Sequence, residues 1–239
     1  MHLNEHAQSA VEWHNAVWQS PAALDYLHGR GLVDASIAAW RIGYCDDEFN
    51  YMGGRVTFPI MDFCGNVVSV AGRAIDGGEP KYWHYPYPKS RYFYGLPLVS
   101  HCSYVVICEG QMDAIMLRQA GYQALAVMGS SLSPVAASLV RLWATAAVVY
   151  PDNVVPDGKA FEKALKWIPV LESVGVTAVF PSRPYENAAC ADPADLLQSN
   201  PCWLHHQIET AVDGISGRDA STYRSEERRV GKECRSRWS

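Results

Sequence analysis

The chain has 239 residues, with 20 Lys and Arg against 25 Asp and Glu and 49% hydrophobic residues, as in ordinary globular proteins. This length can bury the core of one large domain or of two small ones. The seven Cys form no Cys-x-x-Cys pair and no apolar run reaches membrane-spanning length, so the sequence indicates a reducing, cytoplasmic compartment and excludes a zinc ribbon and a membrane segment.

The N-terminal part begins with three short helical patterns and then changes to β structure. The helical patterns cover residues 9–18, 21–29 and 36–40. Ser20 is a good N-cap for the second of them, and Pro21 fits its first turn. Two β-rich runs follow, and the turn sequence Asp62-Phe-Cys-Gly-Asn66 predicts a hairpin between residues 56–61 and 66–70.

A turn-rich, aromatic segment continues to residue 96 and carries a series of cations. The cations are Arg55, Arg73, Lys81, Lys89 and Arg91, and the aromatic residues include Tyr82, Trp83, Tyr85, Tyr92 and Tyr94. Cations neutralise phosphate and aromatic faces stack on any base, so this composition fits single-stranded nucleic acid. A solvated loop with packed aromatic residues explains the same composition about as well.

From residue 104 onward, strand and helix patterns alternate. The strand patterns lie near residues 104–108, 123–128, 146–151 and 176–180, and the helical patterns near 111–120, 133–142 and 158–173. Pro169 should kink or end the last of these helices. This βαβαβαβ order predicts an α/β fold with a mostly parallel sheet and helices on its faces.

Acidic residues follow three of these predicted strands, namely Glu109, Asp152 and Asp192. The carboxyl ends of parallel strands share one edge of the sheet, where ligands of open α/β sheets bind, so these side chains can meet there. Carboxylates from several strand ends provide the oxygen ligands that Mg²⁺ prefers, and such a site would hold nucleotide phosphates for attack by a 3′-hydroxyl. Taken alone, an acid in a βα loop is more often a solvated residue.

The last sixteen residues, 224–239, are highly charged and have no hydrophobic period. They resemble the in-frame translation of a common sequencing adapter, and we expect an artefact here in preference to a basic nucleic-acid-binding tail. Without their six basic and three acidic residues, the chain has 14 basic and 22 acidic residues and a net charge of −8. Affinity for nucleic acid would then come from a local patch of cations.

Two groups of motifs carry a similarity to a known family. The first group is Glu109-Gly-Gln-Met-Asp113, Met128-Gly-Ser-Ser-Leu-Ser133, Tyr150-Pro-Asp-Asn153 and Asp192-Pro193. The second group is Ala23-Leu-Asp-Tyr-Leu-His-Gly-Arg-Gly31, Arg41-Ile-Gly-Tyr44, Gly54-Arg-Val-Thr-Phe-Pro-Ile60, Val70-Ala-Gly-Arg73, Pro80-Lys-Tyr82 and Lys89-Ser-Arg-Tyr-Phe-Tyr-Gly-Leu96. In order and spacing they resemble the Toprim domain and the N-terminal subdomain of the DnaG-type primase core of bacteria and phages, over roughly residues 20–200.

The resemblance implies a core that makes short RNA primers on single-stranded DNA by nucleotidyl transfer with Mg²⁺ or Mn²⁺, as part of a primosome in DNA replication. It implies catalytic roles for Glu109 and Asp152 and a metal site formed by Glu109, Asp113, Asp152, Asp157 and Asp192. It also implies nucleotide or template binding by Arg55, Arg73, Lys81, Tyr82, Lys89 and Arg91. The expected partners are the DNA template, NTPs, a replicative helicase and a zinc-binding module on another polypeptide.

The sequence departs from the family pattern in two acidic motifs. The second Asp of the family's DxD motif falls at Val154, so Asp157 would have to replace it through a longer loop. The family's DPD motif becomes Asp192-Pro-Ala194, with Asp195 one position late. Two alternatives to a primase therefore stay open, a Toprim nuclease and a non-catalytic accessory protein that binds nucleotide or single-stranded DNA.

The expected organisation has four parts. Residues 1–100 are a mixed α+β N-terminal subdomain with a basic groove, 101–200 a Toprim domain with a mostly parallel sheet, 201–223 a helical segment and 224–239 the artefact tail. We expect no zinc in this chain. Because the family's zinc-binding and helicase-binding domains have no counterpart here, we expect a phage or mobile-element primase in a bacterial or phage-infected cell, a separately encoded zinc module, or a truncated sequence.

Overall fold

The computed structural model describes residues 3–129, 131–152, 162, 164–181 and 190–216. The chain forms two compact units, Met1–Leu98 and Val99–Ser239. Two positions of interest for the DxD motif, Val154 and Asp157, lie outside the described residues, as does the tail at 224–239.

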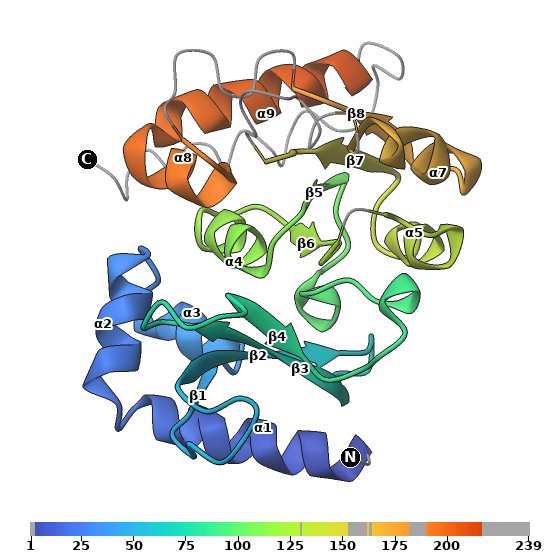
Figure 1. Ribbon diagram of the computed structural model, residues 1–239. Helices are drawn as coiled ribbons and strands as arrows, with labels where there is room; N and C mark the ends of the chain where they lie inside the picture. The colour runs from blue at the N-terminus through green and yellow to red at the C-terminus, as the bar shows by residue number, and fades with distance from the viewer. Residues whose placement is uncertain (1–2, 130, 153–161, 163, 182–189, 217–239) are drawn as a thin grey trace. The chain divides into compact units, whose positions relative to one another are not determined.

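The first unit is a four-stranded antiparallel sheet of order β1-β2-β3-β4, accompanied by helices (Figure 1). Its strands are β1 (Gly43–Cys45), β2 (Arg55–Met61), β3 (Val67–Ala74) and β4 (Tyr82–His84). Its helices are α1 (Leu3–Val17), α2 (Pro21–Gly29) and α3 (Asp34–Ala39), with short 3-10 turns at Lys89–Arg91 and Leu96–Leu98. The hairpin predicted around residues 62–66 is confirmed, since β2 and β3 pair on either side of that turn.

Packing in this unit explains which residues form its core. Helix α1 lies against the sheet so closely that a Cβ added to Gly43 would be 2.7 Å from the carbonyl carbon of Trp13. The aromatic ring of Tyr94 is fully buried and stacks on Trp40, with 4.9 Å between the ring centroids. Strands β1 and β4 have only three residues each, which is too short for a sequence pattern of their own. They form by pairing with the longer strands β2 and β3.

The second unit is a parallel sheet of order β6-β5-β7-β8, which confirms the predicted α/β class (Figure 1). Its strands are β5 (Tyr104–Cys108), β6 (Ala124–Ala126), β7 (Ala146–Val149) and β8 (Thr177–Val179). Its helices are α4 (Gln111–Gln119), α5 (Pro134–Val140), α7 (Trp167–Ser173), α8 (Pro193–Ser199) and α9 (Pro201–Ser216). Helices α4, α8 and α9 lie on one side of the sheet and α5 and α7 on the other.

The inner strands β5 and β7 are the nearly continuous apolar runs expected of a sheet that is covered on both faces. Pro169 lies in the first turn of α7, and the helical backbone is interrupted just before it, at Lys166. This is the expected effect of proline, which fits a first helical turn but not a helix interior. In the described part of the chain, no helix combines the length and apolarity needed to cross a bilayer.

Candidate functional site

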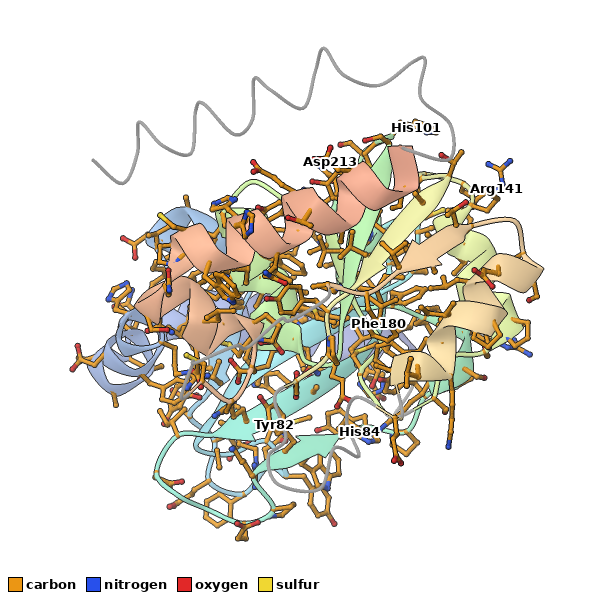
Figure 2. The ribbon with its side chains drawn as sticks, turned by 90° about the horizontal axis from the view of Figure 1, so that it is seen from above. Tyr82, His84, His101, Arg141, Phe180 and Asp213 are labelled. Atoms are coloured by element: carbon orange, nitrogen blue, oxygen red, sulfur yellow. The ribbon has the colours of Figure 1, made fainter. Side chains whose placement is uncertain are left out.

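The carboxyl edge of the parallel sheet carries the first two candidate acids. Glu109 directly follows β5, and Asp152 lies three residues beyond the end of β7. The two strand ends are held together by a hydrogen bond of 2.8 Å from the Tyr150 amide to the Ile107 carbonyl. Figure 2 marks this edge by Phe180, which follows β8, whereas His101, which precedes β5, lies at the opposite end of the strands.

Asp113 is a buried acid that caps two helices. It is only 4% exposed, and its carboxylate accepts a hydrogen bond from the amide of Gly110, the N-cap of α4, three residues earlier. Its Oδ1 also accepts a hydrogen bond of 3.1 Å from the amide of Ala194, in the first turn of α8. Amides at a helix start need acceptors, so Asp113 fixes α8 against the turn that carries Glu109.

Asp192 begins the helix that Asp113 holds. It is the N-cap of α8, and its Oδ1 accepts a hydrogen bond of 2.8 Å from the Asp195 amide. The Asp-Pro sequence explains this start, because Asp is a favoured N-cap and Pro fits the next position. Asp195 therefore lies in the first turn of α8, beside the edge of the sheet at which Glu109 follows β5 and Asp152 follows β7.

The pKa values of the buried acids show that these carboxylates are electrostatic neighbours. Burial, followed by the charges of Glu109, Asp192 and Asp195, raises the pKa of Asp152 from 3.8 to about 7. Burial, followed by the charges of Asp152 and Asp192, raises the pKa of Asp113 well above its ordinary value. Gathering like charges in a half-buried place is unfavourable unless a cation or protons accompany them.

The donor chemistry of this edge fits a divalent cation. The Oδ1 atom of Asp152 is buried and has no hydrogen-bond partner among the described residues. Across those same residues, no group of three or more His, Cys, Asp or Glu side chains is arranged ready to hold a metal ion. Mg²⁺ is commonly held by one or two carboxylates, with waters and substrate phosphates completing its shell, so Glu109 and Asp152 suffice as protein ligands.

The first unit presents the candidate cations in different ways. The guanidinium of Arg73 lies over the rings of Tyr26, at 5.7 Å, and Tyr82, at 5.1 Å, and it donates a hydrogen bond of 2.5 Å to the Tyr82 hydroxyl. Arg73 and Tyr82 are paired residues of β3 and β4 and therefore share one face of the sheet. Lys81, Lys89 and Arg91 are exposed.

Arg55 is placed differently from the other cations. It is only 8% exposed, and its Nη1 donates a hydrogen bond of 2.7 Å to the Pro80 carbonyl. The sequence predicts a template-binding role for Arg55 like that of the other cations, whereas the structure gives its side chain a hydrogen bond to the backbone. Reasoning from sequence also missed the contact of Tyr26 with Arg73, because 47 residues separate them and no local pattern links a helix to a strand at that distance.

The comparisons with known proteins agree with this architecture. Residues 103–156, which include β5, α4, β6 and β7, match the family model of the Toprim domain. The second unit therefore contains a segment that is similar to the Toprim domain. Glu109 and Asp152 lie within the matched residues and follow two neighbouring parallel strands, β5 and β7.

The similarity to curated proteins extends beyond this domain. The chain is 30% identical to the DNA primase of Deinococcus radiodurans, over 82% of the chain and 41% of the relative. It is 26% identical to the DNA primase of Helicobacter pylori strain J99, over 90% of the chain and 43% of the relative. The chain thus spans less than half the length of these relatives, and it is related to the DnaG-type bacterial primases.

Solved structures show that the fold is shared as well. The Escherichia coli primase catalytic core superposes with a TM-score of 0.72 at 24% identity, covering 87% of this chain and 80% of that one. A DnaG primase catalytic domain bound to single-stranded DNA superposes with a TM-score of 0.73 at 22% identity, covering 87% and 81%. The chain has the fold of the DnaG catalytic core.

Proposed function

We propose that this chain is a primase core, which joins ribonucleotides into short RNA primers on single-stranded DNA. The observation that carries the proposal is the gathering of Glu109, Asp152, Asp192 and Asp195 at one edge of the parallel sheet, where burial and then the charges of the other three acids raise the pKa of Asp152 to about 7. The similarity to named DNA primases supports this chemistry over other uses of a Toprim domain.

The proposal assigns the metal to the acids of the second unit. Glu109 and Asp152 would hold Mg²⁺ or Mn²⁺, with Asp192 beside them, and Asp157 is a further candidate that lies outside the described residues. The ion would neutralise the phosphates of the incoming NTP and polarise them toward attack by a 3′-hydroxyl. Asp113 would act by holding Glu109 and α8 in place, since its buried carboxylate accepts hydrogen bonds from the backbone amides of Gly110 and Ala194.

The cations of the first unit are proposed to bind phosphates of the template and of the NTP. Lys81, Lys89 and Arg91 are exposed, as phosphate contacts require. Arg73 is held by two tyrosine rings, which limits the side-chain freedom that binding would otherwise cost. The ring of Tyr82 is 39% exposed and can stack on a base.

Partners beyond template and NTPs are proposed from the family. A zinc-binding module is one, since a solved Aquifex aeolicus primase structure contains zinc-binding and RNA polymerase domains. A replicative helicase is the other.

The test incubates the protein, with and without residues 224–239, with labelled NTPs, Mg²⁺ or Mn²⁺ and a single-stranded template. New short RNA is the expected product. Glu109→Gln should lower its rate about a hundredfold or more, because a ligand to a catalytic cation supplies several kcal/mol of transition-state stabilisation. Asp213→Asn changes the same charge on an exposed part of α9 and should leave the rate unchanged.

The same assay separates the alternatives. A shortened template with no RNA would identify a Toprim nuclease, and this activity would also depend on Glu109. Binding of the template without any product, unchanged by Glu109→Gln, would identify a non-catalytic accessory protein. Either result would refute the primase proposal.

A further inference from the structure

Arg55 is the first residue of β2 and is built into the sheet of the first unit. It pairs with Ala74 on β3 and is 8% exposed. Its aliphatic stem crosses Gly72, where an added Cβ would lie 3.1 Å from the Arg55 Cδ. A side chain at Gly72 would therefore compete with Arg55 for this space.

The guanidinium of Arg55 is directed at main-chain carbonyls. Its Nη1 donates hydrogen bonds to the carbonyls of Pro80, at 2.7 Å, and Lys81, at 3.5 Å. In the described part of the chain no carboxylate forms an ion pair with it. A cation that is buried in this way has its charge satisfied by the segment it holds and is poorly placed to touch a phosphate.

The main chain of Lys81 is held from several directions at once. Its carbonyl accepts a hydrogen bond of 3.1 Å from the Ala74 amide as well as the one from Arg55. Its own amide donates a hydrogen bond of 3.1 Å to the Glu79 carboxylate. The Lys81 side chain is nevertheless exposed, so the contacts fix its backbone and leave its ammonium free for a ligand.

We propose that Arg55 is a positioning residue, which clamps the backbone of Pro80 and Lys81 so that the Lys81 ammonium meets a nucleic-acid phosphate. This inference rests on the proposed function for the identity of the ligand. It differs from the role that sequence reasoning gave Arg55, because Arg55 acts through Lys81 and does not contact the phosphate. The guanidinium suits this task, since its Nη1 alone carries the two N–H groups that reach two neighbouring carbonyls.

The first experiment measures binding of a fluorescein-labelled single-stranded DNA oligonucleotide by anisotropy at several salt concentrations. Removing one phosphate contact should lower the slope of log affinity against log salt by about 0.7. Lys81→Met should produce this change, and so should Arg55→Gln and Arg55→Lys. The double variant Arg55→Gln with Lys81→Met should change the slope by the same amount as Lys81→Met alone, because both act on one contact.

Arg55→Lys is the decisive variant, since it keeps the charge and removes the Nη1 atom that donates both hydrogen bonds. If it binds like the unaltered protein, or if the effects of the two positions add, Arg55 acts by its charge and the inference is wrong. Arg41→Gln removes an exposed arginine from the same unit and controls for the change in net charge.

A second experiment tests the clamp without any substrate. Amide hydrogen exchange at Ala74 and Lys81 should accelerate about tenfold in Arg55→Gln, as expected when a hydrogen bond that holds the segment is removed, and should not change in Lys81→Met. Unchanged exchange with full DNA binding would overturn the clamp while leaving the primase proposal intact. If exchange accelerates in Arg55→Gln but the unaltered protein binds no DNA, the clamp is supported. The proposed function is then refuted, and so is the proposed contact of Lys81 with a nucleic-acid phosphate.

Discussion

Replacing Asp152 by Asn should stabilise the metal-free protein while abolishing its proposed activity. In the folded protein, burial and then the charges of Glu109, Asp192 and Asp195 raise the pKa of the Asp152 carboxyl to about 7, against 3.8 for an ordinary Asp. At higher pH the folded chain therefore holds an ionised carboxylate in a place that disfavours it. Asn has nearly the same shape and carries no charge.

The sign and size of the effect follow from proton linkage. Between about pH 4 and about pH 7 the folded state binds more protons at Asp152 than the unfolded state does. The stability that the protonated Asp152 carboxyl contributes is therefore fully present below this window and is lost as the pH rises through it. Each unit of pKa difference is worth about 1.4 kcal/mol. The difference between the two pKa values of Asp152, 3.8 and about 7, therefore corresponds to a destabilisation of up to about 4 kcal/mol above neutral pH. Relaxation of the residues around Asp152 reduces this to about 2–4 kcal/mol.

Differential scanning calorimetry of the full chain, with a chelator present, measures this directly. At about pH 8 the unit that contains Asp152 should melt about 5–15 °C higher in Asp152→Asn than in the unaltered protein, and at about pH 4.5 the difference should nearly vanish. Mg²⁺ should raise the melting temperature of the unaltered protein at about pH 8 and have little effect on the variant. Asp213→Asn should change neither, because Asp213 is exposed on α9, toward the end of the strands opposite Phe180 (Figure 2).

The reasoning fails if Asp152→Asn is no more stable than the unaltered protein at about pH 8. It fails equally if the gain in stability is the same at both pH values, because a pH-independent gain cannot come from an ionised carboxylate. A stabilised but inactive variant would show that the protein keeps an unfavourable charge at this edge for the sake of binding a cation.

Three further outcomes are expected. Gly110→Ala should lower primer synthesis about tenfold or more and lower the free energy of unfolding by about 1–3 kcal/mol, since the new Cβ would lie 2.7 Å from Oδ2 of Asp113. Gly29→Ala is the control: its Cβ would have nothing within 4 Å, so it should be tolerated in the same assays. Asp113→Ala should destabilise the protein by about 1–3 kcal/mol in urea unfolding, because the amides of Gly110 and Ala194 would lose their buried acceptor, and this loss exceeds the gain from removing a carboxyl whose pKa burial raises; a variant as stable as the unaltered protein would refute the capping role. Tyr94→Phe should raise the free energy of unfolding by about 1 kcal/mol, because the buried Tyr94 hydroxyl has no hydrogen-bond partner among the described residues, and a loss of stability would contradict this.

The sequence alone located most of the parallel sheet and the edge that carries the acids. Continuous apolar runs such as residues 104–108 identify strands that are covered on both faces, and the residues that follow them must lie at one edge whatever the details of packing. The Asp-Pro pair at 192–193 likewise predicts a helix start by local chemistry. Local pattern therefore sufficed to bring Glu109 and Asp152 to the same end of the sheet.

Only the tertiary structure decided what individual charged residues do there. Asp113 and Glu109 belong to one motif, yet Asp113 is turned inward to cap α8, whose Ala194 is 81 residues away. Arg55 belongs to the same series as Lys81 by composition, yet it is buried and bonds to a backbone segment 25 residues later. Burial and hydrogen-bond partners depend on segments that are distant in the chain and close in space, and a sequence pattern, which reports only near neighbours, does not contain them.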